Sequence, residues 1–408
     1  MKKVFFAAGI LVFAAFVGLV FLTKDVQVAG PVHVGHLWTG KPGDSWVLCY
    51  VSAEERAQQR RVSPGRNSSY TTDTYYRYRL HVRTLPGGAI AREVLLGDFK
   101  RGEGRPAPQI VGVVGDMLWL WHHQLEARAL PNLEVRGDEA ALRRTDPAAA
   151  DLMPREVTQF KVLASPAGLL IRGRDARFYL VDPMRFALSP VAAADLPVTT
   201  FASLADHRFD FITTPAQGRR LTSPYNQMKQ HLLTRDGQWF GLLSESERDQ
   251  QPKWITEDSR PSGNVARSLY RAPYQRDDRY AVIDPKAVAR TGDASFVQGG
   301  FLLRHGWTPW QLTEPASALV LAKRRLGEAE PWEVIRLTLD GRVAWQAATG
   351  LADPGEFIDA GPYFVVAGRP LPNSVGGPEA DRRERIVWID EATGAKATLL
   401  VATGEVTK

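Results

Sequence analysis

The sequence predicts an all-β protein built from repeated four-stranded units, and three observations support this. Apolar runs are short, rich in Val, Leu, Ile and aromatic residues, and bounded by Gly, Pro, Asp or Asn, as strands bounded by turns are. Long stretches with helical period are missing after the first 24 residues. Turn signals also recur along the chain at a nearly constant spacing.

The predicted strands are the apolar runs themselves. The clearest are Ile110–Val114, Met117–Trp121, Gly168–Ile171, Arg177–Val181, Gln238–Leu243, Tyr280–Ile283, Ser295–Leu303, Ala318–Ala322, Glu333–Leu339, Tyr363–Ala367 and Ile386–Ile389. Only Gly137–Arg144 and Ala148–Met153 are helix candidates, as one or two turns within a loop.

Seven strand-ending turns define the repeat: Leu85-Pro86, Leu130-Pro131, Asp182-Pro183, Asp236-Gly237, Asp284-Pro285, Asp340-Gly341 and Asp390. They lie 45 to 56 residues apart, close to the roughly 40 to 50 residues of one propeller blade. We therefore expect a β-propeller of about seven four-stranded blades. Two stacked β-sandwiches remain an alternative if the period does not hold.

The hairpin Ile386–Lys396 shows the local chemistry of a unit, with a strand that ends at Asp390 and a turn closed by Thr393-Gly394. Asp accepts hydrogen bonds from its own turn, and Gly supplies a positive φ. The hairpin resembles the repeat of quinoprotein-type (PQQ-like) β-propellers. Ile335–Trp345 is a shorter version with a Trp where that family often places one. Partial versions are Phe178–Pro183, Tyr280–Pro285 and Gly115–Trp121.

The resemblance implies the propeller fold but not the family's redox chemistry. Quinoprotein dehydrogenases hold their cofactor with a disulfide between adjacent cysteines, a calcium site and an Asp base. This chain has a single cysteine, Cys49, so we expect no cofactor. The resemblance therefore implies the non-catalytic branch, in which the rims and central funnel bind partners.

The first 24 residues indicate a membrane-inserting segment. Lys2 and Lys3 precede the uncharged run Val4–Leu22, which spans about 28 Å as a helix. The positive-inside rule then places the rest of the chain across the membrane. We expect a transmembrane signal-anchor at 1–24, a linker at 25–36 and the propeller at 37–408. A cleaved signal peptide is the alternative, although the small-residue site at 28–30 is followed by Pro31.

The charge does not indicate a nucleic-acid partner. The formal net charge is +6, but Lys2, Lys3 and Lys24 belong to the membrane segment. Without them, 48 basic residues face 45 acidic ones, since the 51 basic residues lose three. The densest basic stretch, Arg248–Arg279, is interleaved with acidic residues, so no basic footprint is predicted.

Aromatic residues and the cysteine are expected to pack. Eight tryptophans lie in or beside strand-like runs, where we expect them to fill the space between blades: Trp38, Trp46, Trp119, Trp121, Trp239, Trp332, Trp345 and Trp388. Trp307 and Trp310 flank a turn, and packing over a loop is favoured over ligand stacking. Cys49 is interpreted as a small buried hydrophobe.

No residue pattern supports a catalytic, cofactor-binding or metal assignment. The candidates considered are His33 and His36, the pair His122-His123, the segment Gly43-Asp44-Ser45, and the acidic set Glu245, Glu247 and Asp249. The histidine pairs lack further ligands, the serine lacks the following glycine of a nucleophile turn, and the acidic set lacks a calcium-loop glycine. For His122-His123, strand alternation predicts that only one ring points inward.

We therefore expect a single-pass inner-membrane protein whose propeller faces the periplasm as an interaction or scaffold module. Its partners would be the inner membrane, through the N-terminal helix, and an envelope protein. The polar insertions expected to bind are Ala53–Thr74, Glu134–Glu156, Ser244–Arg279 and Gly368–Arg385. The alternative is a periplasmic hydrolase or lyase with its active site in the central funnel.

Overall fold

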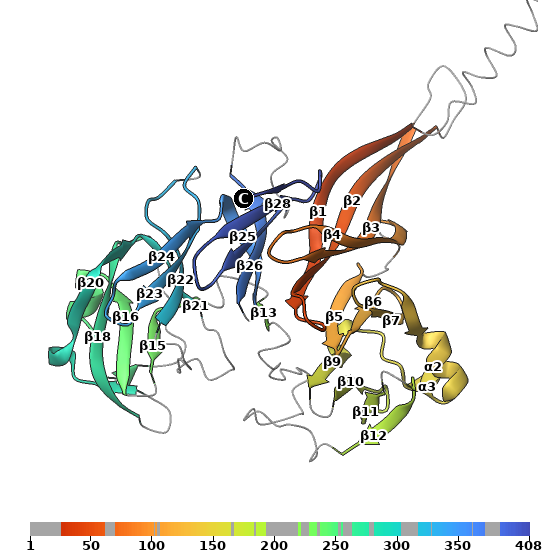
Figure 1. Ribbon diagram of the computed structural model, residues 1–408, viewed down its shortest axis with the longest axis horizontal. Coiled ribbons are helices and arrows are strands. Elements are labelled where there is room, and N and C mark those ends of the chain that lie inside the picture. The colour runs from red at the N-terminus through yellow and green to blue at the C-terminus, as the bar shows by residue number, and fades with distance from the viewer. Residues whose placement is uncertain are drawn as a thin grey trace, which may run out of the picture.

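Strands dominate the computed structural model of the chain (Figure 1). The structure describes residues 26–61, 70–101, 103, 107–164, 167–182, 185–192, 219–221, 228–234, 237–251, 254–255, 263–276, 281–302, 317–327, 329–360, 362–371 and 384–408. Within these residues the strands form six antiparallel sheets, numbered in the chain order of their middle strands. The all-β prediction is confirmed.

The first three sheets each contain four strands that follow one another in chain order. The first contains β1 (Val26–Gly40), β2 (Val47–Arg61), β3 (Tyr70–Thr84) and β4 (Ile90–Lys100). The second contains β5 (Gln109–Val114), β6 (Met117–Trp121), β7 (Leu125–Ala129) and β8 (Val135–Asp138). The third contains β9 (Phe160–Ala164), β10 (Ala167–Arg172), β11 (Phe178–Val181) and β12 (Leu188–Val191).

The last three sheets have additional strands. The fourth contains β15 (His231–Leu233), β16 (Gln238–Leu243), β18 (Arg267–Arg276), β19 (Ala281–Ile283) and β17 (Trp254–Ile255), with β20 (Ala289–Phe296) also paired to β18. The fifth contains β14 (Met228–Lys229), β21 (Gln298–Leu302), β22 (Ser317–Lys323), β23 (Glu333–Thr338) and β24 (Val343–Ala348). The sixth contains β13 (Arg219–Leu221), β25 (Leu351–Ala360), β26 (Tyr363–Pro370), β27 (Arg385–Asp390), β28 (Lys396–Leu400) and β29 (Val406–Thr407).

Short helices occupy some connections. They are α2 (Glu139–Thr145), α3 (Ala149–Leu152), α5 (Glu245–Asp249) and the 3₁₀ turns η1 (Val157–Gln159) and η4 (Pro285–Ala287). The two helix candidates of the sequence coincide with α2 and α3 and are confirmed. The Asp138 side chain caps the N-terminus of α2 by accepting a hydrogen bond from the Ala141 amide at 2.7 Å.

The middle strands are buried on both faces, which explains their continuous apolar sequences. In β6, Met117, Trp119 and Trp121 pack toward the third sheet. The alternate residues Leu118 and Leu120 pack toward the first sheet. Because successive side chains of a strand point to opposite faces, β6 needs a neighbouring sheet on both sides.

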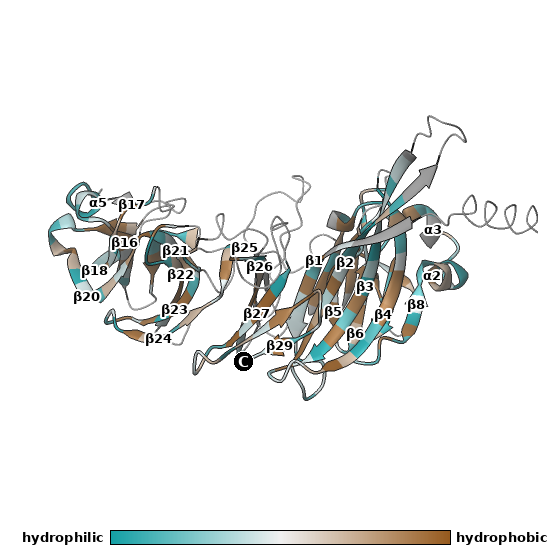
Figure 2. Cartoon of the chain, turned by 90° about the horizontal axis from the view of Figure 1, so that it is seen from above, coloured by the Kyte–Doolittle hydropathy of each residue, from teal (hydrophilic) through white to brown (hydrophobic). Residues whose placement is uncertain are grey.

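The sheets pack against one another in the order of the chain. Apolar clusters join the first sheet to the second, the second to the third, the fourth to the fifth and the fifth to the sixth. Another cluster joins the sixth sheet back to the first. The first strands of neighbouring sheets contact each other, β1 with β5 and β25, and β5 with β9. In Figure 2, β1, β21 and β25 accordingly lie toward the upper side of the row of sheets, and β4, β24 and β27 toward the lower side. This arrangement is compatible with a propeller-like fold.

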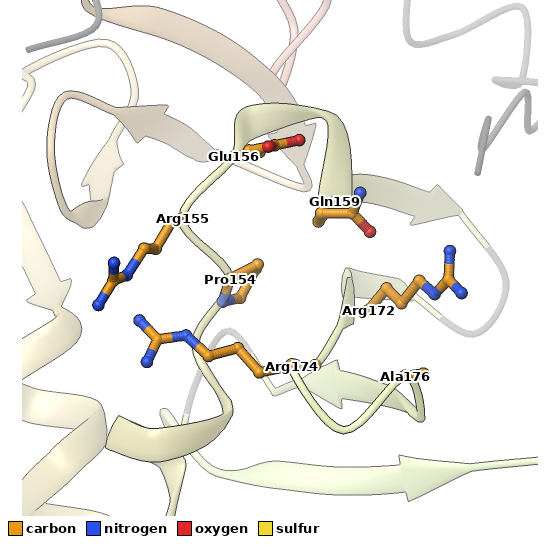
Figure 3. A pocket seen from close by; sticks show the side chains of 8 residues that line it. Pro154, Arg155, Glu156, Gln159, Arg172, Arg174 and Ala176 are labelled. Atoms are coloured by element: carbon orange, nitrogen blue, oxygen red, sulfur yellow. The ribbon is translucent and has the colours of Figure 1, made fainter. Parts of the chain in front are cut away.

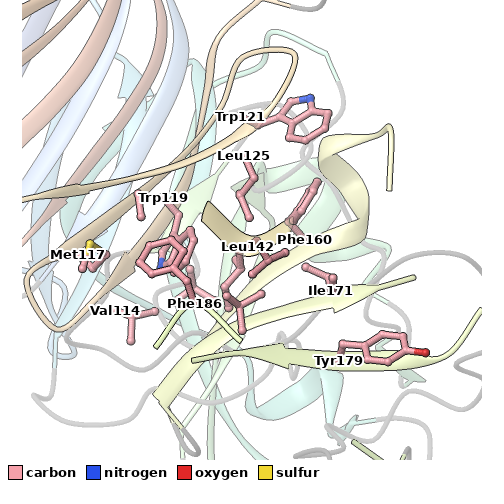
Figure 4. Packing of buried hydrophobic residues seen from close by; sticks show 14 of the residues in the cluster. Val114, Met117, Trp119, Trp121, Leu125, Leu142, Phe160, Ile171, Tyr179 and Phe186 are labelled. Carbon is pink, nitrogen blue, oxygen red and sulfur yellow. The ribbon is translucent and has the colours of Figure 1, made fainter. Parts of the chain in front are cut away.

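Seven of the eight tryptophans fill the spaces between sheets as predicted, whereas Trp239 packs in a cluster formed by the fourth sheet alone. Between the second and third sheets, the rings of Trp119 and Phe186 have centroids 5.6 Å apart, and those of Trp121 and Phe160 4.9 Å apart (Figure 4). The fully or nearly buried tryptophans are Trp38, Trp119, Trp121, Trp239, Trp332 and Trp388, while Trp46 and Trp345 are half-buried. Trp307 and Trp310 lie outside the described residues.

Polar contacts reinforce the junction between the first and sixth sheets. Trp388 Nε1 of β27 donates to the Pro86 carbonyl oxygen at 2.9 Å. Arg83, which is 3% exposed, donates from Nη1 to the Gly88 oxygen at 2.7 Å and from Nη2 to the Gly404 oxygen at 3.1 Å. Gly88 has φ +73°, and a Cβ there would lie 2.9 Å from the Trp388 ring, so this close approach requires glycine.

The predicted repeat corresponds to a recurring hairpin. Five of the predicted turns connect the third and fourth strands of a four-strand run, namely those at 85–86, 130–131, 182, 340–341 and 390. The fourth turn signal does not fit, because Gly237 lies between the first two strands of its sheet, β15 and β16. Asp284-Pro285 begins η4 between β19 and β20, where β18 pairs with both strands.

Three expectations need correction or fall outside the described residues. No closed ring of seven blades is found: the structure describes six sheets, and the described pieces between the third and fourth, β13 and β14, extend β25 and β21 instead. Residues 26–36 of the expected linker belong to β1, because they pair with β2. Among the described residues no helix is long and apolar enough to cross a membrane, and the expected segment 1–24 lies outside them.

The substitution Trp388→Phe tests the junction between the first and sixth sheets. It removes the donor to the Pro86 oxygen and leaves a smaller ring beside Gly88. We expect the free energy of unfolding, measured by urea titration, to fall by about 1–3 kcal/mol. Trp46→Phe in the same cluster is the control, because Trp46 is only half-buried. An equal or smaller loss for Trp388→Phe would argue against this role.

Candidate functional site

The two ends of the sheets differ in their connections. In a four-stranded antiparallel meander, the start of the first strand, the link from second to third strand and the end of the fourth lie at the same end. We call this end the loop side. It carries the linker with α2, α3 and η1, the connection with α5, and the tip of the long β2–β3 hairpin. The other end carries mainly short turns, such as those at 115–116, 339–342 and 391–395, together with one longer connection, 303–316, between β21 and β22.

A pocket of about 540 Å³ lies on the loop side of the third sheet (Figure 3). One wall is the stretch that connects α3 to η1, and the other is the turn between β10 and β11. The Arg174 amide donates to the Leu152 oxygen at 3.1 Å, which ties the two walls together. The lining residues are Pro154, Arg155, Glu156, Gln159, Arg172, Gly173, Arg174 and Ala176. Three arginines against one glutamate give this pocket an excess of positive charge.

Sequence reasoning did not identify this pocket. Arg155 and Arg174 are 19 positions apart and belong to separate connections, so no local motif marks them. The clearest available signal was the Arg-Gly-Arg sequence at 172–174, directly after the predicted strand that ends at Ile171.

A second polar group lies within the first sheet. Ser52 Oγ on β2 lies 2.8 Å from His81 Nε2 on β3, and His81 Nδ1 lies 3.3 Å from Glu93 Oε2 on β4. The Tyr50 ring stacks on the His81 ring, with centroids 4.5 Å apart. Burial lowers the pKa of His81 to about 4, against the opposing effect of the Glu93 charge, so the imidazole is neutral at pH 7.

The order of these groups is that of a nucleophile, a base and an acid, but their surroundings differ from an active site. Ser52 is only 3% exposed, so its hydroxyl lacks the access that a substrate requires. The His81 Nδ1–Glu93 contact also lacks hydrogen-bond alignment. The three strands β2, β3 and β4 lie outward of β1, so the group is not in a central funnel. We interpret it as a polar cross-strand contact.

The histidine pair at the end of β6 divides as alternation predicts. His122 is 6% exposed and its Nε2 lies 2.9 Å from Glu126 Oε2, whereas His123 is exposed. Burial acts to raise the pKa of the Glu126 carboxyl. The hydrogen bond from His122 and the charge of the Arg128 guanidinium outweigh this effect and hold that pKa below its usual range.

The acidic candidates do not converge on a common site. Glu247 forms a capping box with Ser244 at the start of α5 and pairs with Arg267, whose Nη2 lies 2.8 Å from Glu247 Oε1. Glu245 and Asp249 are exposed positions of the same helix. Within the described residues no group of three His, Cys, Asp or Glu side chains is arranged to hold a metal ion.

The remaining candidates have separate surroundings. Cys49 is fully buried, and burial raises the pKa of its thiol, which agrees with its interpretation as a small hydrophobe. Ser45 lies in the exposed turn between β1 and β2. His33 and His36 are both on β1, and the His33 ring packs edge-on against Tyr76 at 6.1 Å.

The stability of the fold should depend on pH through His81. An unfolded histidine titrates near pH 6.5, whereas folded His81 titrates at about 4. Its pKa is depressed by folding, so its contribution is fully present above pH 6.5 and is lost as the pH falls toward 4, where only the unfolded state gains the proton. At pH 5 the loss reaches about 2 kcal/mol.

Urea titrations between pH 7.5 and 5 measure this loss. His81→Gln should flatten the decline in the free energy of unfolding by that amount. The control His123→Gln changes an exposed histidine and should leave the decline unchanged. Equal slopes for the wild-type chain and His81→Gln would contradict the assignment.

Comparison with known proteins adds no family. No protein-family model matches the chain, and no curated protein matches it.

Proposed function

We propose that this chain is a membrane-anchored scaffold of the cell envelope, whose propeller-like domain faces the periplasm and binds an envelope protein. The observation that carries the proposal is the asymmetry of the sheets. The cationic pocket and most of the long connections belong to the loop side, while the opposite ends carry mainly short turns, apart from the connection 303–316 between β21 and β22. Binding residues are disproportionately found on loops that a rigid scaffold holds in place.

The proposal includes non-catalytic repeats of the quinoprotein type, and the β27–β28 hairpin supports this. Asp390 Oδ1 accepts hydrogen bonds from the Ala392 amide at 3.0 Å and from the Thr393 amide and hydroxyl, each at 2.9 Å. Gly394 closes the turn with φ +74°. Trp345 of the fifth sheet donates from Nε1 to the Glu391 oxygen at 2.8 Å, so it links neighbouring units.

The position of the N-terminus supports anchoring at the loop side. Val26, two residues after the proposed anchor, begins β1 at that end and pairs with Gln59 of β2. The β2–β3 hairpin extends in the same direction, at the upper right of Figure 1. The segment Val4–Leu22 is apolar and long enough to span a bilayer. The anchor would therefore hold the loop side toward the membrane, where envelope partners are concentrated.

Site-specific photo-crosslinking in cells tests the binding surface. A photo-reactive amino acid at Ala140 of α2 or Ser246 of α5 probes the loop side. The same residue at Ala392 or Asn132 probes the short turns, and all four positions are exposed. We expect a discrete crosslinked product from the loop-side positions and none from the turns. Absence of products at all four positions, or equal products at both ends, would count against the proposal.

A hydrolase is the second candidate, favoured only by the 2.8 Å contact between Ser52 and His81. Because Ser52 is 3% exposed, we expect no labelling of the folded chain by an alkyl fluorophosphonate. Mass spectrometry of the treated protein checks this, with Ser52→Ala as the reference. Labelling at Ser52 that disappears in His81→Gln would replace the scaffold proposal with an enzymatic one.

A further inference from the structure

We infer that the pocket lined by Arg155, Arg172 and Arg174 binds a phosphate group. The inference goes beyond the proposed function, because a phosphate site would exist whether or not a partner protein binds the loop side. It rests on the charge, the geometry and the size of the pocket.

Two of the arginines carry charges that no ion pair within the described residues neutralises. Within the described part of the chain, neither Arg155 nor Arg174 forms an ion pair, and both are exposed. Figure 3 shows their guanidinium groups turned toward the same side of the pocket. Two like charges held on one side favour an anion between them, because it relieves their mutual repulsion.

The nearest acidic side chain of the turn is engaged elsewhere. The Tyr179 hydroxyl donates to Asp175 Oδ2 at 2.6 Å, and the Arg177 amide donates to Asp175 Oδ1 at 3.1 Å. The hydrogen bond from Tyr179 holds the pKa of Asp175 below its usual range. This carboxylate is therefore charged but directed toward Tyr179, and it does not pair with Arg174. Glu156 is the acidic residue in the lining.

The backbone holds the arginines in position. The Arg174 amide is bonded to the Leu152 oxygen at 3.1 Å, which joins the turn to the segment that carries Arg155. The turn itself is closed by hydrogen bonds from Gly173 to Arg177 at 2.8 Å and from Ala176 to Gly173 at 2.9 Å. A site whose backbone is already fixed loses little conformational entropy on binding.

The chemistry of the lining matches phosphate. A guanidinium presents several N–H donors in a planar fork that binds two phosphate oxygens at once, and two such groups match a dianion. At about 540 Å³ the pocket lies within the range of small-ligand sites and exceeds the size of a bare phosphate. It has room for the group that carries the phosphate, such as a sugar or a glycerol headgroup.

Calorimetric titration of the full chain, purified in an uncharged detergent, tests the inference. The probes are inorganic phosphate, glucose 1-phosphate, and dihexanoylphosphatidylglycerol below its critical micelle concentration. They separate free phosphate, a sugar phosphate and a lipid headgroup as the source. We expect at least one probe to bind, with an affinity that falls as salt rises. Arg155→Gln and Arg174→Gln should each weaken that binding about tenfold or more.

Arg290→Gln is the matched control, because it removes the same charge from an exposed position of β20 in the fourth sheet. It should leave the affinity unchanged, and all three variants should keep the wild-type urea midpoint. Binding by no probe, or equal weakening by all three variants, overturns the inference. If no probe binds but the loop-side crosslinks form, the phosphate site is rejected and the scaffold proposal stands. If a probe binds but no crosslinks form, the scaffold proposal is rejected and the phosphate site stands.

Discussion

The two-sided burial of the middle strands is the constraint on which the rest of the structure depends. A strand such as β6, with Trp119 directed to one neighbour and Leu118 to the other, is stable only between two sheets. Apolar clusters accordingly join the sheets in one series, from the third through the second, first, sixth and fifth to the fourth. The same requirement brings the last sheet back to the first, where Trp388 lies against Gly88.

This constraint also decides where chemistry can occur. The faces of the sheets pack against neighbouring residues, so polar side chains on those faces are buried, as those of Ser52 and His81 are. The ends of the sheets do not have to pack against another sheet. At the loop side, connections differ in length and composition without disturbing the packed strands, and the pocket at Arg155 and Arg174 lies between two such connections. The strands thus hold the fold together by packing, while the surface at their ends remains available for binding.

Much of the fold could be predicted because it is local. The runs around Met117–Trp121 and Ile386–Ile389 identify strands, and Asp390 with Thr393-Gly394 identifies a turn, from residues that are neighbours in sequence. The fourth sheet was less predictable because β18 pairs with both β19 and β20, which breaks the regular hairpin order. The pocket and the Ser52–His81 contact depend on residues brought together only by pairing between strands or by packing of connections. No spacing in the sequence encodes them.

The junction of the first and sixth sheets has a consequence for how the protein is made. Its hydrogen bonds join residues 302 and 321 positions apart, so the first sheet has no partner on one face until the C-terminal strands have been synthesised. Contacts of such sequence separation form late, after the entropy of closing a long loop has been overcome. During synthesis the apolar face containing Leu48 and Tyr50 therefore remains open to chaperones and proteases, and a chain that ends before β27 retains that exposed face.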